Sequence, residues 1–532
     1  MTEKVRQYTD SCLVEEKTID QGEQPLNEKY REFFSTVHLR ADLGRKAIRG
    51  GAAVMAAELG SNILRIGSIT VLARLLLPED FGLIAMVASL MVFAERFKEL
   101  GLGDATVQKK EINHEQVSTL FWINILVCAG IALLLAGLSK TIAWFYQEPR
   151  LTAVSIVLAS TFLLSGLVIQ HHSLLRRQMR FGALAAIQLF STGFSIVVAI
   201  VLAYYDFGYW ALVARELSRN VFVLIATFLV CAWRPGLPKR NIGLGDFLFF
   251  GKNVTGYNMV HFFSRNFDKI IIGKLYGSFW VGIYANAYQL ISVPVSQIQY
   301  PVNTVALPAL STLQGEPAEF RSHFEKLLRL MTFFSMPVVV FVALFADLVS
   351  NLLLGAKWTK AIPIFQVLAV GAFIEPVVYI VATALQAVGK TKEYFRLGLI
   401  NAILFICCQG IGSLWGAIGV AAGVSSAVFL SLAVCLAYGL RHTPVKISSL
   451  LRGLAISSLC SLITALIMFG VRYAVGWTFP TPWVIPFLIG GAAIYIGVWL
   501  VVPGGRRQLS EYWDQIKGAI PGPRRQDRVA QR

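Results

Sequence analysis

Long apolar runs dominate this 532-residue chain from about residue 50 to residue 503. A helix needs about 20 consecutive, mostly apolar residues to cross about 30 Å of hydrocarbon, and these runs have that length with few charges. Only 15% of the residues are charged, whereas a soluble domain carries about 25%. The sequence therefore predicts an all-α polytopic membrane protein.

We predict fourteen transmembrane spans, of which the eighth and the eleventh are the weakest predictions. They cover residues 50–73, 81–103, 117–138, 151–171, 183–204, 209–231, 246–267, 279–304, 329–353, 361–387, 394–412, 414–438, 452–473 and 483–502. An even number of spans places both termini on the same side of the membrane.

The loops between the spans carry their cations unevenly. The side that holds the termini has many, including Arg45, Lys46, Lys109, Lys110, Arg176, Arg177, Arg180, Lys239, Arg240, Arg321, Lys326, Lys390, Arg441 and the tail from Arg506. The opposite loops have far fewer: Arg74, Lys140, Arg150, Lys269, Lys274, Lys357, Lys360 and Arg472. Because cytoplasmic loops are enriched in Lys and Arg, we expect both termini in the cytoplasm and the chain in the bacterial inner membrane. The net charge of +17 therefore reflects the membrane topology and does not indicate nucleic-acid binding.

Other compositional signals exclude several kinds of site. Six of the seven cysteines lie in apolar runs, and no CxxC pair or Cys/His cluster occurs. We therefore expect no disulfide framework, no metal site and no cofactor. Residues 27–40 place aromatic and aliphatic side chains at roughly helical spacing, which fits an interfacial helix or a partly ordered tail. These side chains are Tyr30, Phe33, Phe34 and Val37.

An internal repeat relates the two halves of the chain. Residues 51–85 align without a gap to residues 251–285, so that Arg65 recurs as Arg265 and Gly82 as Gly282. A shift of 200 residues equals six spans, so span 7 repeats span 1 in the same orientation. The repeat predicts two six-helix lobes followed by two further helices. The expected domains are a cytoplasmic segment (1–48), an N-lobe (49–240), a C-lobe (241–440), spans 13 and 14 (441–505) and a basic cytoplasmic tail (506–532).

Five segments have distinctive local sequences: ARLLLPEDFG at 73–82, ELGLGDATVQKK at 99–110, STLFW at 118–122, SLLRRQMRF at 173–181 and FGYWALV at 207–213. In these segments the chain resembles the polysaccharide exporters of the multidrug/oligosaccharidyl-lipid/polysaccharide (MOP) superfamily, and the Wzx-type flippases most of all. The resemblance implies a MATE-like fold of twelve core helices plus two. It also implies an undecaprenyl-pyrophosphate-linked oligosaccharide as substrate, moved from the cytoplasmic to the periplasmic leaflet. A polysaccharide polymerase and a chain-length regulator are partners that it implies. No catalytic motif exists to carry over, so the residue roles come from physical arguments.

Ionisable residues deep in a span are costly and usually face a cavity or a partner. In span 1, Glu58, Asn62 and Arg65 lie at i, i+4 and i+7, which puts them on one helix face. We interpret Arg65 as part of an anion site, with Glu58 and Asn62 as polar cavity residues. The alternative is a structural link between Glu58 and Arg65.

Span 6 carries Arg215, Glu216 and Arg219. The two arginines share a face at i, i+4, where unpaired like charges repel. Helix geometry leads us to expect that Glu216 serves only Arg219 or a neighbouring helix. The arginines are candidates for binding a phosphate or a uronate, and an interhelical salt bridge is the alternative.

Span 7 supplies Lys252, Asn258 and Arg265 as further candidates for substrate contact. Arg265 could instead pair with Asp268, and Lys252 could extend to the cytoplasmic interface. Glu375 in span 10 is a candidate for ion coupling, although it could simply accompany the helix kink at Pro376.

Three further groups of polar or aromatic residues complete the candidates. We expect Asp347 at the periplasmic interface, and His171 and His172 at a cytoplasmic helix end, where they would contact lipid headgroups. Four aromatic residues are candidates for stacking on sugar rings, with anchoring at the membrane interface as the alternative: Tyr257, Trp280, Tyr284 and Tyr288.

The balance of these charges favours an anionic substrate. Guanidinium groups stay charged and bind phosphate oxygens in pairs, so an excess of buried arginine suits a pyrophosphate headgroup. An ion-coupled drug or cation exporter of the same fold is the alternative, and there acids should dominate an apolar pocket. A membrane-embedded glycosyltransferase, polymerase or ligase is disfavoured because the predicted periplasmic loops are short. The absence of a P-loop motif disfavours direct use of ATP. We therefore predict a transporter and not an enzyme.

Overall fold

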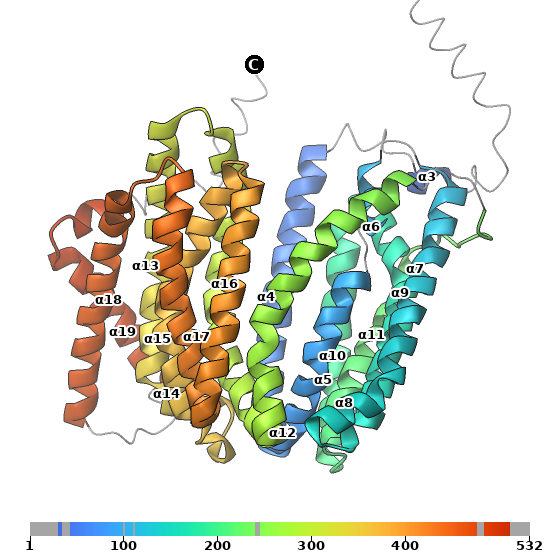
Figure 1. The fold of residues 1–532 in the computed structure, drawn as a ribbon, viewed down its shortest axis with the longest axis horizontal. Coiled ribbons are helices and arrows are strands. Elements are labelled where there is room, and N and C mark those ends of the chain that lie inside the picture. The colour runs from blue at the N-terminus through green and yellow to red at the C-terminus, as the bar shows by residue number, and fades with distance from the viewer. Residues whose placement is uncertain are drawn as a thin grey trace, which may run out of the picture. The chain divides into compact units, whose positions relative to one another are not determined.

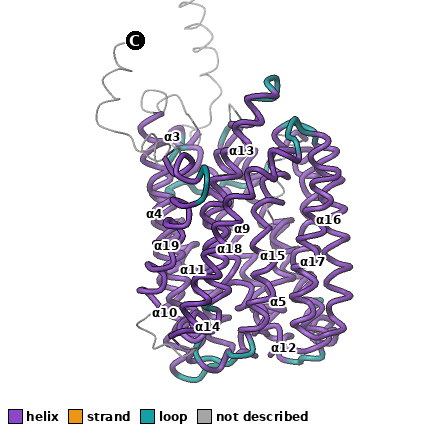
Figure 2. The backbone as a smooth tube through the Cα atoms, turned by 90° about the vertical axis from the view of Figure 1, so that its left-hand side faces the viewer, coloured by secondary structure: helices purple, strands orange, loops and turns teal. Residues whose placement is uncertain are grey.

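The computed structural model describes residues 30–34, 43–98, 102–109, 112–239, 245–475 and 484–510. Within this part the side chains of residues 251–265, among others, lie outside the description. The described residues form helices joined by short loops, with no β-strand among them (Figure 2). Their backbone contacts divide the chain into two compact units. The first unit is Met1–Leu75 with Leu90–Met259, and the second is Leu76–Ser89 with Val260–Arg532.

The long helices of the first unit pack side by side as a bundle. They are α4 (Leu43–Leu75), α7 (His114–Gly137), α9 (Arg150–Arg177), α10 (Phe181–Tyr204) and α11 (Tyr209–Val230). Three shorter helices are α3 (Arg31–Phe34), α6 (Leu102–Gln108) and α8 (Ser139–Tyr146). Helix α10 contacts both α4 and α11, and α9 contacts both α7 and α11. Because α10 packs against both of its partners, α4, α10 and α11 lie next to one another in this unit (Figure 1).

The second unit contains the remaining helices. They are the later part of α12 (Gly245–Thr312), then α13 (Pro317–Leu344), α14 (Ala346–Leu353), α15 (Ala361–Ala387), α16 (Thr391–Gly412), α17 (Gly416–Val434), α18 (Ile447–Val475) and α19 (Val484–Val501). Helix α15 contacts α13 and α17, and α18 contacts α13 and α19. Fully buried aromatic side chains such as Phe320 and Phe324 fill the core between α12, α13 and α15.

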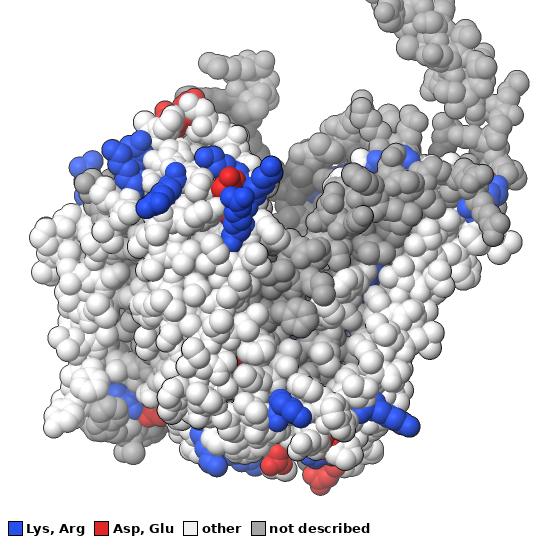
Figure 3. Space-filling model, in the orientation of Figure 1, with Lys and Arg blue, Asp and Glu red and all other residues white. Residues whose placement is uncertain are grey.

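Each of the fourteen predicted spans overlaps a helix of the structure. Among the described residues, seven helical segments are long and apolar enough to cross a membrane: His114–Gly137, Arg150–Arg177, Phe181–Tyr204, Pro317–Leu344, Ala361–Ala387, Thr391–His442 and Gly453–Ala474. On the visible face of the second unit, Lys and Arg gather at the two ends of the helices and leave an uncharged band between them (Figure 3). The prediction of an all-helical polytopic membrane protein is confirmed.

Two sharp turns repeat 200 residues apart. Helix α4 ends at Leu75, and α5 (Pro78–Lys98) begins three residues later; its Asp80 carboxylate accepts a hydrogen bond from the Leu77 N–H at 2.9 Å. Helix α12 is interrupted at Gly277, whose φ of 79° and ψ of −179° are accessible to glycine and strained for other residues. Spans 7 and 8 are therefore the two parts of α12, joined at Gly277 as α4 and α5 are joined at Leu76–Leu77.

The two repeats touch at equivalent glycines within the second unit. A Cβ added to Gly82 would collide with the carbonyl oxygen of Ser278, and a Cβ added to Gly282 would collide with that of Pro78. The two contacts are the same contact shifted by 200 residues. The helices α5 and α12 approach each other so closely here that only glycine fits at either position.

Candidate functional site

The polar face predicted on α4 is present and points toward α10. The Glu58 carboxylate accepts a hydrogen bond from Gln188 Nε2 on α10 at 2.7 Å. Glu58 and Asn62 are half-buried, and Arg65, two turns further along, is exposed from its own unit. The alternative, a direct link between Glu58 and Arg65, is not found, because the Glu58 carboxylate turns toward Gln188.

On α11 a single carboxylate holds two guanidinium groups. Glu216 accepts a hydrogen bond from Arg215 Nη2 at 3.1 Å, and its second oxygen lies 3.5 Å from Arg219 Nη2. The expectation that Glu216 serves only Arg219 or a neighbouring helix was wrong. Adjacent residues diverge by about 100° around a helix, yet two long side chains can bend back toward each other. All three side chains remain between 29% and 43% exposed, so the ion pairs are accessible.

Arg65 of α4 belongs to the same charge cluster. It is near enough to the Glu216 carboxylate of α11 for the two charges to attract each other. Arg65 lies ten residues before the end of α4 at Leu75, and Arg219 lies ten residues after the start of α11 at Tyr209. At 1.5 Å per residue, both lie about 15 Å from the same end of the unit, which is about half the thickness of a hydrocarbon core.

We call Arg65, Arg215, Glu216 and Arg219 the arginine cluster. It has two positive charges in excess of its carboxylate. Glu58 and Gln188 lie at a second level, about 10 Å nearer the opposite end of the helices. The cluster is therefore a cationic site at mid-depth in a span, with a Glu–Gln pair on one side of it.

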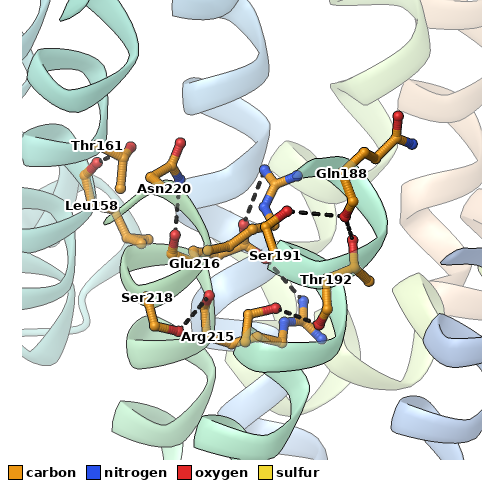
Figure 4. Close-up of polar contacts among 11 residues, drawn as sticks. Leu158, Thr161, Gln188, Ser191, Thr192, Arg215, Glu216, Ser218 and Asn220 are labelled. Carbon is orange, nitrogen blue, oxygen red and sulfur yellow. Dashed lines mark hydrogen bonds and ion pairs between the residues drawn. The ribbon is translucent and has the colours of Figure 1, made fainter. Parts of the chain in front are cut away.

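Helix α10 supplies the neutral wall of this site (Figure 4). Ser191 and Thr192 both donate hydrogen bonds to the Gln188 carbonyl, at 2.9 and 2.8 Å, which is the side-chain back-bonding that bends helices. On α11, Asn220 donates to the Glu216 carbonyl at 2.8 Å. These bonds satisfy the small polar side chains within their own helices and leave the guanidinium groups facing the site.

Two buried N–H donors at the site have no acceptor among the described residues. They are Arg219 Nε and Asn62 Nδ2. A buried donor without an acceptor costs about 1–3 kcal/mol, so each group gains from an oxygen supplied by water or a ligand. The cluster combines excess positive charge with unfilled donors, and it can therefore bind an anionic oxygen ligand.

Sequence reasoning missed Gln188, which is the partner of Glu58. The signal was available, because Gln188 is the one amide in the otherwise apolar and small-residue helix of span 5. Other candidates cannot be joined to the cluster. The side chains of Lys252, Asn258 and Arg265 lie outside the described residues. Glu375 is half-buried in α15 directly before Pro376, and its role as a coupling residue stays a prediction.

The second unit corrects one expectation about α12. Tyr284 is fully buried and donates a hydrogen bond to the Asp268 carboxylate at 2.8 Å, so it is not available to stack on a sugar. This bond joins the two parts of α12 on either side of the Gly277 turn. Asp268 also accepts from the backbone N–H of Lys269 at 2.7 Å.

The expected positions of His171 and His172 were wrong. Helix α9 continues to Arg177, six residues beyond the predicted end of the span, so both histidines lie inside it. His171 is fully buried against Phe228, with ring centroids 4.4 Å apart, and His172 hydrogen-bonds Thr227 at 3.0 Å. These rings pack between α9 and α11 and do not reach lipid headgroups.

The described part of the N-terminal segment packs on the first unit, and its expected interfacial position stays a prediction because residues 27–29 and 35–40 lie outside the described residues. Within the described residues 30–34, Tyr30 stacks on His114 with ring centroids 5.2 Å apart. Arg177 donates a hydrogen bond to the Phe34 carbonyl at 3.2 Å. Trp233, in the segment that follows α11, donates to His114 Nδ1 at 3.1 Å. His114 therefore joins the N-terminal segment to the connection that leads to α12.

At the other end of the second unit, Asp347 has a partner that the sequence did not indicate. The nearly fully buried Arg472 of α18 donates to the Asp347 carboxylate at 2.5 Å and also to the Leu344 carbonyl. The pair fastens α18 to the junction of α13 and α14. Among the described residues, no group of three or more His, Cys, Asp or Glu side chains is arranged to hold a metal ion.

The chain shares its fold with solved MOP-superfamily transporters. The lipid II flippase MurJ in an inward closed conformation superposes with a TM-score of 0.69 and 16% identity, over 84% of this chain and 97% of that protein. An inward-facing multidrug resistance MATE family transporter superposes with a TM-score of 0.52 and 15% identity, over 75% of this chain and 96% of the transporter. At these identities the similarity concerns the fold, and it confirms the MATE-like architecture.

Sequence comparison finds relatives that are named for polysaccharide biosynthesis. The teichuronic acid biosynthesis protein TuaB of Bacillus subtilis is 29% identical over 391 residues, which cover 71% of this chain and 79% of TuaB. The lipopolysaccharide biosynthesis protein WzxC of Escherichia coli is 25% identical over 371 residues, covering 68% and 74%. The succinoglycan biosynthesis transport protein ExoT of Rhizobium meliloti is 23% identical over 364 residues, covering 68% and 73%. The model of the polysaccharide biosynthesis protein family matches residues 71–363, more than half of the chain, and the chain therefore belongs to this family.

Proposed function

We propose that this membrane transporter moves undecaprenyl-pyrophosphate-linked oligosaccharide repeat units from the cytoplasmic to the periplasmic leaflet of the inner membrane. The product would supply the assembly of exopolysaccharide, capsule or O-antigen. In this proposal both termini are cytoplasmic, and the two repeats form lobes that alternate between access to the two sides. A polymerase and a chain-length regulator would act on the delivered units.

The arginine cluster is the observation that carries the proposal. A pyrophosphate that leaves water for the membrane interior loses its hydration, and fixed donors must replace it. Guanidinium groups keep their charge and present paired donors to phosphate oxygens. The cluster offers three of them at mid-depth against one carboxylate, together with the unfilled Arg219 Nε.

An apolar cavity in the second unit supports a lipid-linked substrate. It has a volume of about 290 Å³ and lies between α13, α18 and α19, the last two of which follow the twelve repeat helices. Phenylalanine and aliphatic side chains line it, with Thr464 and Tyr495 as its polar-tipped members. A cavity of this composition suits a hydrocarbon chain and not a sugar.

The relatives support the same substrate class. Their names refer to teichuronic acid, lipopolysaccharide and succinoglycan, and MurJ is named as a flippase for lipid II. The alternating access of the proposal rests on the 200-residue repeat. Rocking of one repeat against the other is the general behaviour of transporters built from repeats.

An exporter of organic cations is the competing function, and the cluster disfavours it. A cationic substrate needs uncompensated carboxylates, whereas Glu216 is held by two arginines and Glu58 by Gln188. The two functions therefore predict opposite effects when the arginines are neutralised. Anion transport should be lost, and cation transport should be unchanged or improved.

Deletion of the gene and complementation test the proposal. We expect the deletion strain to lose surface polymer and to accumulate lipid-linked repeat units on the cytoplasmic leaflet. Wild type should restore the polymer, and Arg65→Gln or Arg219→Gln should fail to do so at equal membrane abundance. Arg176→Gln is the matched control, because this exposed arginine pairs only loosely with Asp104 at 3.4 Å, away from the cluster.

One result would count against the proposed function, and another against the role of the arginine cluster in it. Normal surface polymer in the deletion strain, with altered sensitivity to cationic drugs, would assign the protein to drug export. Full complementation by both cluster variants would leave the flippase function standing and remove the arginines from the substrate path.

A further inference from the structure

The part of α12 that follows Gly277 has an unusual polar face. At about 100° per residue, its polar side chains fall within one arc of about 160°. They are Gln289, Ser292, Ser296, Gln297, Gln299, Tyr300, Asn303 and Thr304. The opposite side of the helix carries Val295, Ile298, Val302 and Val305. This division explains why the eighth span is one of the weakest predictions.

The polar face carries no ionisable group other than the Tyr300 phenol, and much of it is uncovered by its own unit. Ser296, Gln297 and Thr304 are exposed, and Tyr300 is 71% exposed. Gln289 and Gln297 lie about 18 Å and 30 Å along the helix from Gly277, within or at the edge of the hydrocarbon thickness. Amide side chains at this depth cannot favourably face acyl chains, so they face other protein groups or a water-filled cavity.

The hydrogen bonds of the face leave binding capacity unused. Ser296 and Thr304 bond to carbonyls of their own helix, at 2.9 and 2.7 Å. Asn303 accepts from Thr383 of α15 at 2.8 Å, which fixes its orientation. The Gln299 amide is 9% exposed, and its Nε2 has no acceptor among the described residues.

We propose that this neutral face binds the sugar rings of the transported glycan, with Tyr300 as the apolar platform for a ring. Sugar hydroxyls both donate and accept hydrogen bonds, and glutamine, asparagine and hydroxyl side chains do the same. A flat aromatic surface beside such groups suits the C–H face of a pyranose. The inference rests on the proposed function and assigns the glycan part of the substrate to the α12 face.

The test compares two probes on the purified full-length protein. One probe is undecaprenyl pyrophosphate, which has no sugar, and the other is the undecaprenyl-pyrophosphate-linked repeat unit extracted from the host membrane. Apparent dissociation constants are measured by native mass spectrometry for wild type and variants. Val305→Ala is the matched control, because Val305 lies on the opposite side of the same helix turn and is 62% exposed.

We expect Tyr300→Ala to weaken binding of the sugar-bearing probe by about five- to tenfold and to leave the sugar-free probe within about twofold. This loss corresponds to about 1–1.4 kcal/mol, since about 1.4 kcal/mol is tenfold in a dissociation constant. Gln297→Ala should act in the same direction, by about threefold, and provides the test if Tyr300→Ala does not reach the membrane. Val305→Ala should change neither probe.

Equal weakening of both probes by Tyr300→Ala, or no change in either, would overturn the inference, since an interfacial anchor would not distinguish them. Wild type that binds both probes with equal affinity would overturn it as well, and the proposed function would stand. Wild type that binds neither probe would refute the proposed function itself.

Discussion

Neutralising Glu216 and neutralising Arg219 should change anion affinity in opposite directions. Glu216 occupies the guanidinium groups of Arg215 and Arg219, at 3.1 and 3.5 Å, in a site that has two positive charges in excess. Glu216→Gln keeps the shape and removes the competitor. Arg219→Gln removes a donor that the ligand needs.

The structure gives a size for both effects. Hydrogen bonds to charged groups contribute about 1.5–3 kcal/mol. These side chains keep 29–43% of their exposure, so solvent screens them and the lower end applies. A change of about 1.4 kcal/mol is tenfold in a dissociation constant. We therefore expect Glu216→Gln to bind undecaprenyl pyrophosphate about tenfold more tightly and Arg219→Gln about tenfold more weakly.

The assay measures binding of undecaprenyl pyrophosphate to purified protein at two salt concentrations, with uncharged undecaprenol as the control ligand. Undecaprenol affinity should not change in either variant. Both effects should shrink in high salt, because the site is partly solvated. If Glu216→Gln weakens binding as much as Arg219→Gln does, the carboxylate is a structural part of the site, and our account of a displaceable counter-ion is refuted.

Three further changes test the packing. Gly282→Ala should lower folded yield and thermal stability by at least about 1–3 kcal/mol, because its methyl group meets a carbonyl oxygen that cannot move away; a thermal shift within error would contradict the close approach. Arg472→Leu should destabilise by about 3 kcal/mol, and adding Asp347→Leu should restore part of the loss, since the double change leaves no unpaired charge. Arg150, at the start of α9, lowers the pKa of Glu148 below its usual 4.5 by a hydrogen bond. The pair should therefore stabilise the protein by up to about 1 kcal/mol above pH 4.5 and lose that contribution as the pH falls through the folded pKa. Arg150→Gln should abolish this acid-dependent part of the change in melting temperature.

The architecture could be predicted because the bilayer imposes a simple rule. Every span must be an apolar helix of a set length, and each predicted span fell on a helix. The turn at Gly277 was implied by the gap between two predicted spans, although its left-handed backbone was not. Periodicity also placed Glu58 and Arg65 correctly on one face.

Partners were harder to predict than positions. Gln188 lies 130 residues from Glu58 in sequence, and nothing local to either residue indicates that they meet. Arg215 and Glu216 are adjacent, and ideal helix geometry argued against the bond that long flexible side chains make. The error for the histidines of α9 came from a span boundary placed six residues early, which moved two buried rings to a helix end.

The glycine contact between α5 and α12 also has a meaning for the origin of the chain. Gly82 meets the Ser278 carbonyl as Gly282 meets the Pro78 carbonyl, so exchanging the two repeats leaves the contact unchanged. A contact with this property is isologous, the kind made by two identical subunits around a two-fold axis. In a dimer of single six-helix units, one glycine would meet its own copy. In such a dimer a single mutation would change both sides of the contact at once, whereas after gene fusion each of the two glycines can be changed alone.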